Sequence, residues 1–181
     1  MSGLLELRLA GAGGQGVILA AIILAEAALS ESKHVAQSQS YGPEARGGMC
    51  KADVVISRSD IDYPQVEEAD CLLALTQESL DKYISVVREG GVIVADSRLK
   101  IPPNEKRVRI IPAAIIATAT ESIGRAVTAN IVALGALNAA MNIVSEPALE
   151  AAVLKYVPKG TEELNIRALK EGEALIQNVA R

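Results

Sequence analysis

Apolar and polar residues alternate over residues 4–10, and the alternation leads directly into the segment Gly11-Ala12-Gly13-Gly14-Gln15-Gly16. Alternation with a period of two is typical of a strand, and clustered glycines are typical of a tight turn. Residues 17–29 then place large apolar side chains near a helical period in an alanine-rich segment. The start of the chain therefore predicts a strand, a glycine turn and a helix, which is half of a βαβ unit.

The rest of the chain continues this alternation before it becomes helical. Further strands are predicted for residues 34–38, 51–57, 71–75, 92–95 and 108–111. Helices are predicted for residues 76–88 and 124–144, for a segment capped by Ser145 with Pro147 in its first turn, and for a last segment that Thr161 opens. This order indicates a three-layer α/β/α fold with a mostly parallel, Rossmann-like sheet and a helical C-terminal part. The length fits a single domain over residues 1–181.

Composition determines which side chains build the core and which partners are excluded. Half of the residues are hydrophobic but only 2% are aromatic, so Ala, Val, Ile and Leu must form the core. The formal net charge is −4, and no cluster of Lys and Arg supplies the electrostatic footprint of a protein that binds phosphate backbones. Four scattered tyrosines do not form a platform for base stacking. No nucleic-acid partner is therefore expected.

No targeting or membrane segment is predicted. The N-terminus carries charges inside its apolar stretch, which excludes a signal peptide and predicts a cytoplasmic protein. The stretch between Arg125 and Glu146 is uncharged and long enough to span a bilayer, but asparagines interrupt it and Ala and Gly dilute its hydrophobicity. A helix that is uncharged all round is better explained by burial, either inside the domain or against another subunit.

The metal-binding capacity of the sequence is small. Cys50 and Cys71 lack metal-ligand spacing with each other and with the only histidine, His34. Reduced cytosolic thiols are the expected state. An iron–sulfur cluster needs about four thiolates, so this chain alone cannot hold one.

The glycine turn matches the dinucleotide fingerprint Gly11-x-Gly13-x-x-Gly16, in which backbone N–H groups and a helix N-terminus attract a pyrophosphate. That function also needs an acid about 20 residues further on, at the end of the second strand, to hold the ribose. Residues 37–40 at this position contain no carboxylate, and Glu31 precedes the strand. NAD or FAD binding, contact with another anion, and close packing of helix on strand all stay open.

The second glycine-rich segment is Tyr41-Gly42-Pro43-Glu44-Ala45-Arg46-Gly47-Gly48. Arg46 could hold a carboxylate or a phosphate through two parallel hydrogen bonds, or it could pair with Glu44 or lie in solvent. Both glycine segments are expected at the C-terminal ends of adjacent strands, where ligands of open α/β sheets bind. The candidate binding residues are Gly11, Gly13, Gly14, Gln15, Gly16, Tyr41, Glu44, Arg46 and Gly47.

No complete catalytic constellation is recognisable, and no catalytic residue or metal ligand is predicted. No Gly-x-Ser-x-Gly elbow precedes a helix, and His34 is best explained as an ordinary residue at a strand edge. Asp96 follows a buried strand, where it is either a functional acid or a cap for the next two residues.

The two glycine segments together resemble the gamma subunit of 2-oxoacid:ferredoxin oxidoreductases, the family of enzymes for pyruvate, 2-oxoglutarate, 2-oxoisovalerate and indolepyruvate. The resemblance continues through residues 54–57, residues 69–70 and the segment Thr128-Ala129-Asn130-Ile131-Val132-Ala133-Leu134-Gly135, so it covers nearly the whole chain. The form Tyr-Gly-Pro-Glu-Ala-Arg-Gly-Gly is most similar to the 2-oxoglutarate branch, with the branched-chain 2-oxoacid branch second.

The resemblance implies a role inside a larger enzyme that converts a 2-oxoacid to acyl-CoA and passes electrons to ferredoxin. It implies that alpha and beta subunits hold thiamine diphosphate and Mg, and that a ferredoxin-like delta subunit holds the iron–sulfur clusters. This chain would bind no cofactor alone, would be inactive when isolated, and would complete the assembly on the coenzyme A side of the site. Two alternatives remain: a free-standing NAD- or FAD-dependent dehydrogenase, and a module that binds acyl-CoA or another anion. A homodimer of the isolated chain also stays open.

Overall fold

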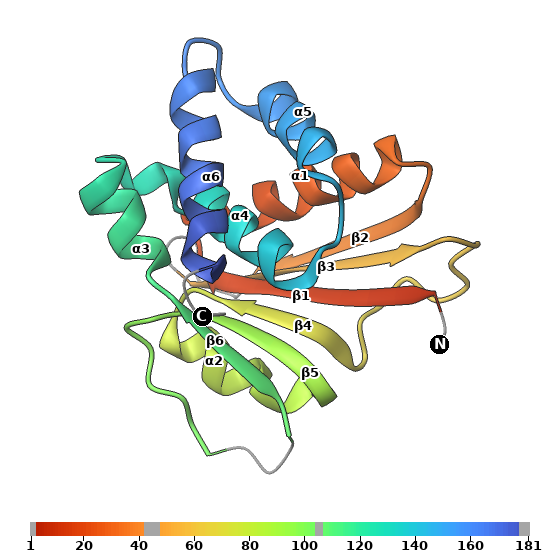
Figure 1. Cartoon of the computed structure of the whole chain (residues 1–181). Coiled ribbons are helices and arrows are strands. Elements are labelled where there is room, and N and C mark those ends of the chain that lie inside the picture. Colours follow the sequence, from red (N-terminus) through yellow and green to blue (C-terminus); the bar gives the residue numbers. More distant parts are fainter. Residues whose placement is uncertain (1–2, 42–47, 104–106, 178–181) are drawn as a thin grey trace.

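The computed structural model describes residues 3–41, 48–103 and 107–177. Six strands form one sheet in the order β2-β3-β1-β4-β5-β6, which Figure 1 shows between two layers of helices. The strands are β1 (Leu4–Ala12), β2 (His34–Tyr41), β3 (Met49–Ser57), β4 (Ala69–Ala74), β5 (Val87–Asp96) and β6 (Arg109–Ala113).

The sheet is parallel on one side of β1 and antiparallel on the other. Strand β4 pairs in parallel with β1, and β5 and β6 continue in the same direction. Strand β3 runs antiparallel to both β1 and β2. The expected parallel arrangement therefore holds for β1, β4, β5 and β6, but β3 runs in the opposite direction. The physical reason is the short connection between β2 and β3, because a parallel crossover needs about a dozen residues or more.

Helices cover both faces of the sheet. Figure 1 shows α1, α4, α5 and α6 over one face and α2 against the other, where α2 contacts β1 and β4. The α-helices are α1 (Val17–Ser30), α2 (Gln77–Tyr83), α3 (Ile115–Ala117), α4 (Ala129–Met141), α5 (Glu146–Tyr156) and α6 (Glu162–Gln177). The short turns are η1 (Ile84–Val86), the π-helical η2 (Thr118–Ser122) and η3 (Ala126–Thr128). None of the helices in the described residues is long and apolar enough to cross a membrane.

The side chains of each strand alternate between two hydrophobic layers. Leu7 and Leu9 of β1 face the core under α1 and α4, whereas Ala10 faces the layer that contains Leu72 and Tyr83 near α2. All three of these aliphatic β1 side chains are fully buried. Both faces of the central strands are therefore buried, as helices on two sides require, although the α2 side also holds the charged pair of Arg8 on β1 and Asp53 on β3.

The uncharged helix α4 packs inside the domain, against α6. Gly135 of α4 lies against the backbone carbonyl of Leu169, and Gly172 of α6 lies against that of Val132, so a β-carbon at either glycine would collide with backbone. Of the two explanations for the uncharged stretch, burial within the domain is the one observed. Such close approaches agree with a core built from small and aliphatic side chains.

Two helices differ from their predicted boundaries. The helix predicted for 76–88 ends at Tyr83, and β5 begins at Val87, because Val87 pairs with Ala69 before the register shifts. The helix predicted for 124–144 is a 3-10 turn followed by α4, which ends at Met141 and is capped by Asn142 in a left-handed conformation with φ of 50°. The structure also places a helical segment at 115–122, ahead of the predicted start of the helical part.

Candidate functional site

The glycine turn between β1 and α1 is closed by Gln15. Its side-chain Oε1 accepts a hydrogen bond of 2.7 Å from the backbone N–H of Ala12, and its backbone N–H donates to the Ala12 carbonyl at 3.1 Å. A β-carbon on Gly11 would lie 2.6 Å from that Oε1. Gln15, a predicted binding residue, therefore stabilises the turn through these two hydrogen bonds. The need for glycine at position 11 is explained by close packing against the Gln15 side chain.

Helix α1 begins without a side-chain cap. Its N-cap is Gly16, whose φ of 72° and ψ of 19° are left-handed, and the described residues provide no side-chain hydrogen bond to the cap. Gly14 is also left-handed, with φ of 93°. The first N–H groups of a helix have no intrahelical acceptor, and the helix dipole adds partial positive charge there. The start of α1 therefore has the charge and the free N–H groups to receive an anion, and anion binding at this turn stays a prediction.

The two glycine segments meet at the same end of the sheet. The backbone N–H of Gly13 donates to the carbonyl of Gly48 at 2.8 Å, and Ala12 pairs with Met49. The predicted proximity is thus confirmed for the ends of both segments, although β3 separates β1 from β2, so these strands are not adjacent. Tyr41 ends β2 opposite Cys50. Glu44, Arg46 and Gly47 lie outside the described residues, and their roles stay predictions.

A cavity of about 240 Å³ adjoins the glycine turn. It lies between the turn, η3 with the start of α4, and the connection from α5 to α6. Its lining residues are Gly14, Gly16, Leu19, Val127, Thr128, Asn130, Ile131, Val157, Pro158, Thr161, Leu164 and Asn165. Sequence analysis identified only the two glycines. Three of the other lining residues, Thr128, Asn130 and Ile131, lie in the segment that carries the family resemblance, but that segment was not predicted to be part of a binding site.

Two buried amides face this cavity. Asn130 is 4% exposed, donates weakly from Nδ2 to the Gly16 carbonyl at 3.4 Å, and accepts from the Ile131 N–H at its Oδ1. Asn165 is 7% exposed and donates from Nδ2 to the carbonyl and the hydroxyl of Thr161, at 2.9 and 3.0 Å. Buried amides normally satisfy most of their hydrogen-bonding capacity.

The remaining candidate polar residues have structural roles. Buried Asp96 accepts from the N–H and Nε of Arg98, at 3.2 and 2.7 Å, and from the N–H of Ile116 at 2.8 Å, which supports its interpretation as a cap. Exposed His34 lies on the edge strand β2 with its Nδ1 3.2 Å from a carboxylate oxygen of Asp60. The structure thus confirms the interpretation of His34 as a strand-edge residue.

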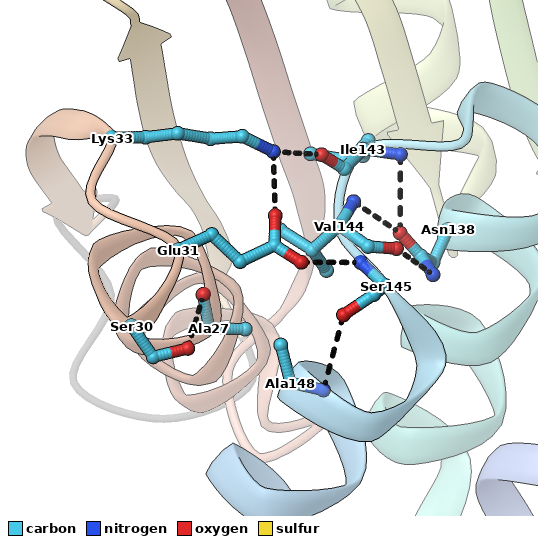
Figure 2. Close-up of polar contacts among 9 residues, drawn as sticks. All are labelled: Ala27, Ser30, Glu31, Lys33, Asn138, Ile143, Val144, Ser145 and Ala148. Carbon is cyan, nitrogen blue, oxygen red and sulfur yellow. Dashed lines mark hydrogen bonds and ion pairs between the residues drawn. The ribbon is translucent and has the colours of Figure 1, made fainter.

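Glu31 lies at the far end of α1 from the glycine turn. Its carboxylate accepts from Lys33 Nζ at 2.8 Å and from the backbone N–H of Ser145 at 2.8 Å, as Figure 2 shows. Lys33 also donates to the Ile143 carbonyl at 2.6 Å. These bonds lower the pKa of Glu31 from 4.5 to about 2, chiefly through Lys33. Glu31 therefore ties the end of α1 to the start of α5 and is too far along the helix to hold a ribose at the turn.

The cysteines do not offer an iron–sulfur site. Cys50 is on β3 and Cys71 on β4, both are buried, and burial raises the pKa of the Cys71 thiol to about 12. A cluster ligand must be a thiolate, which such burial disfavours. Within the ranges that the structure describes, no three His, Cys, Asp or Glu side chains gather in a metal-binding group.

Fold and site together define an α/β subunit with an anion-receptive glycine turn, an adjoining apolar cavity and, in its described parts, no recognisable catalytic constellation. The chain belongs to the pyruvate ferredoxin/flavodoxin oxidoreductase family, whose model matches residues 6–175. It is 48% identical to the 2-oxoglutarate synthase subunit KorC of Methanocaldococcus jannaschii over 92% of this chain and 91% of that protein. It is 37% identical to the ketoisovalerate oxidoreductase subunit VorA of Methanothermobacter thermautotrophicus over 92% of this chain but 35% of that protein.

Solved structures give the same assignment. A keto/oxoacid ferredoxin oxidoreductase gamma subunit from Geobacter sulfurreducens is 46% identical, with a TM-score of 0.89 and 98% coverage of both chains. A 2-oxoglutarate:ferredoxin oxidoreductase from Magnetococcus marinus shares the fold at a TM-score of 0.88 and 23% identity, over 98% of this chain and 32% of that one. The predicted family is confirmed: the chain is a gamma-type oxidoreductase subunit. The higher identity to KorC than to VorA agrees with the predicted order of branches.

Proposed function

We propose that this chain is the gamma subunit of a 2-oxoglutarate:ferredoxin oxidoreductase, which converts the 2-oxoacid to an acyl-CoA and passes electrons to ferredoxin. The observation that carries the proposal is the 48% identity to a 2-oxoglutarate synthase subunit over nearly the full length of both chains. The Magnetococcus marinus relative of the same fold was solved with 2-oxoglutarate, coenzyme A and succinyl-CoA bound.

In this proposal the chain contributes binding and assembly, and the other subunits contribute the redox chemistry. Thiamine diphosphate with Mg belongs to the alpha and beta subunits, where it supplies carbanion stabilisation. The iron–sulfur clusters belong to a ferredoxin-like delta subunit, since neither buried cysteine here suits a cluster. The isolated chain is then inactive, and its place is the cytoplasm.

The glycine turn is the part of this chain that meets coenzyme A. The uncapped start of α1 offers backbone N–H groups and partial positive charge to the coenzyme's phosphates. Arg46, in the segment whose last residue, Gly48, accepts a hydrogen bond from Gly13 of the turn, is the candidate for a phosphate or for the carboxylate of the oxoacid. In this proposal the candidate residues bind charged groups of the ligands and take no part in decarboxylation or electron transfer.

The alternative of a free-standing dehydrogenase gains no support from the sheet. In a dinucleotide-binding fold the second strand lies parallel beside the first and supplies the ribose acid. Here the antiparallel strand β3 occupies that position. The other alternative is a free-standing module that binds acyl-CoA or another anion. It would use the same turn, but it would have no redox subunits as partners.

An anaerobic pull-down of the full-length chain from its native cells tests the proposal. Co-purification of thiamine-binding and cluster-binding subunits is expected, together with coenzyme A-dependent reduction of ferredoxin or a dye that is fastest with 2-oxoglutarate. The separately purified chain serves as the control and should show no turnover. A preference for another 2-oxoacid would contradict the branch, whereas recovery of the chain alone with saturable NAD or FAD binding would contradict the whole proposal.

A further inference from the structure

We infer that the exposed edge of β2, together with the flank of α1 above it, is an interface between two copies of this chain. Strand β2 is the outermost strand of the sheet and pairs only with β3 in the part of the chain that the structure describes. Residues 37–40 of this strand are exposed. An unpaired edge offers a row of N–H and C=O groups to which another strand can bind, so natural proteins normally protect it.

The two edges of the sheet differ in their protection. Strand β6, at the other edge, has five residues and contains Arg109 and Pro112, and both a charge and a proline hinder the addition of a further strand. Strand β2 has eight residues, contains no proline and no Lys, Arg, Asp or Glu, and pairs with β3 from His34 to Tyr41 without a bulge. The edge at β2 is therefore open to strand addition, whereas the edge at β6 is obstructed.

The hydrogen bonds of the neighbouring strands determine which groups of β2 point outward. The backbone N–H of Gly13 donates to the Gly48 carbonyl, and hydrogen-bonded pairs recur at every second residue along antiparallel strands. The even-numbered residues of β3 therefore bond to β1, and the odd-numbered ones bond to β2. The register aligns the odd-numbered residues of β3 with the even-numbered residues of β2. The backbone groups that consequently point away from the sheet include those of Val35, Gln37 and Gln39.

The flank of α1 above this edge is apolar. Helix α1 lies over β2 and β3, and it contacts α5 and α4, the second of which lies over β4 and β5 (Figure 1). Glu26 faces α5, where Lys155 binds its carboxylate. Ile18, Ile22 and Leu29 share another face, because they are four and seven residues apart. Leu29 is 54% exposed and both isoleucines are partly exposed, so this face is the flank that points away from α4, toward the edge of the sheet.

A second copy of this chain suits this surface because the surface has no unpaired charge. Two copies that each carry a net charge of −4 repel each other, so a neutral surface is the favourable place for them to meet. The charged groups at its border are paired within the chain, Glu26 with Lys155 and Glu31 with Lys33. A two-fold axis perpendicular to the sheet would continue the sheet from one copy to the other and turn the two apolar flanks toward each other, which is a self-complementary contact.

The two-fold pairing has a definite register. Opposite residues in an antiparallel pair both bond to each other or both bond away from each other, so the axis passes through a residue rather than between two. An axis at Ser38 pairs Gln37 with Gln39 of the second copy and Val35 with Tyr41, which uses the outward-pointing groups along the whole strand. The two Ser38 residues then form a non-hydrogen-bonded pair, with Cα atoms about 4.5 Å apart.

Disulfide trapping of the full-length chain tests this register. Ser38→Cys brings two thiols within the range that a disulfide spans, whereas the control Ser40→Cys, on the same face of the same strand, leaves the Cα atoms about 13 Å apart. The native Cys50 and Cys71 are buried and should not react. We expect the wild-type chain to sediment at about twice 19.0 kDa. Mild oxidation should cross-link the Ser38→Cys variant and leave the Ser40→Cys variant as separate chains.

Two further variants keep the test decisive if Ser38→Cys fails to fold. Gln37→Pro removes an outward-pointing N–H but keeps the pairing with β3, and Leu29→Glu places a charge on the apolar flank. Each should weaken the dimer at least about tenfold in sedimentation equilibrium, because the symmetry doubles the effect of each lost contact. Ile101→Glu, at another exposed apolar residue, lies beyond the end of β5 and should leave the dimer unchanged.

Three outcomes would overturn the inference. The first is a monomeric wild-type chain with no cross-link in the Ser38→Cys variant. The second is equal cross-linking of both cysteine variants, which would mean that the strands do not pair about Ser38. The third concerns the assembled oxidoreductase, where the Ser38→Cys cross-link is also expected: its absence, with loss of a subunit from the Gln37→Pro complex, would mean that a strand of another subunit occupies the edge. None of these outcomes depends on which 2-oxoacid the enzyme uses, so the proposed function is tested separately.

Discussion

The side-chain amide of Asn130 fills the space that a β-carbon on Gly16 would need, 2.6 Å from its Nδ2 and 2.8 Å from its Cγ. This contact brings the start of α4 to the glycine turn, although the two residues are far apart in the chain. It explains why the third glycine of the motif is required here even before any ligand is considered: a larger residue would push α4 away from the turn.

A matched pair of alanine variants tests this contact. Gly16→Ala combines left-handed backbone strain with a collision against Asn130, whereas Gly14→Ala has the strain alone, because nothing lies within 4 Å of its β-carbon. We expect a loss of about 1–2 kcal/mol for Gly14→Ala and at least about 1 kcal/mol more for Gly16→Ala. Urea unfolding of the two variants measures the difference, and equal losses would show that Asn130 moves aside without cost.

The crossing of α4 and α6 gives a second stability prediction. A β-carbon at Gly135 would collide with the carbonyl of Leu169, which is backbone and cannot rotate away. Gly135→Ala should therefore cost about 3 kcal/mol, at the upper end for overpacking. Gly3→Ala is the control because no atom lies within 4 Å of its β-carbon. A thermal-unfolding midpoint unchanged from wild type in Gly135→Ala would show that the helices can separate freely.

Local patterns predicted the elements whose causes are local. Alternation and glycines located β1, the turn and α1. Ser145 caps α5, where its Oγ accepts from the Ala148 N–H at 3.4 Å, and Thr76 caps α2 in a capping box. Such signals depend on neighbours in the chain, so one sequence is enough to find them.

Features that depend on distant contacts could not be predicted in this way. The place of β3 between β1 and β2 follows from its long-range pairing with β1, and the early end of α2 follows from the pairing of Val87 with Ala69. Asn165 lines the cavity beside the glycine turn only because α6 packs against α4. Gln15 was predicted to bind a ligand from its place in the motif. Its bond to Ala12 is local, between residues three apart, but it depends on the exact turn conformation and became visible only in the structure.

A buried ion pair on the sheet gives a third prediction. Arg8 donates from Nε and Nη2 to the carboxylate of Asp53, at 2.7 and 2.8 Å, and both side chains are almost fully buried. Among the described residues, Arg8→Met leaves only Lys51 to pair with the Asp53 charge, so a loss of about 3–5 kcal/mol is expected. The double variant with Asp53→Leu should recover much of that loss, because Lys51 is exposed enough to turn to water.

The exposed pair of Arg167 and Glu171 is the comparison for this experiment. Arg167→Met should change the free energy of unfolding by less than about 1 kcal/mol, as is usual for exposed pairs on a helix. A double-mutant cycle in chemical denaturant measures both couplings. If Arg8 and Asp53 couple no more strongly than the exposed pair, the burial of their charges has no energetic consequence.

The contacts of Glu31 in Figure 2 predict a dependence of stability on pH. The folded pKa of about 2 is below the ordinary 4.5, so Glu31 stabilises the fold fully above about 4.5 and loses this contribution as the pH falls toward 2. Because the carboxylate is partly exposed, screening should limit the effect to about 1 kcal/mol. Glu31→Gln should therefore destabilise the protein at pH 7 but hardly at pH 2. Exposed Glu68→Gln is the control, and a difference between wild type and Glu31→Gln that does not shrink on acidification would contradict the assignment.

Arg46 provides the direct test of the second glycine-rich segment, and this prediction depends on the sequence alone because the residue lies outside the described ranges. A guanidinium that holds a phosphate or carboxylate through two bonds stabilises the bound state more than a neutral contact does. In the assembled enzyme, Arg46→Ala should raise the KM for coenzyme A or for the oxoacid about tenfold, and Arg46→Lys should restore little because an ammonium cannot form both bonds. The substrate whose KM rises identifies the group that Arg46 binds. Exposed Arg58→Ala should leave both constants unchanged. If Arg46→Ala behaves like Arg58→Ala, Arg46 pairs with Glu44 or lies in solvent, and the binding role is wrong.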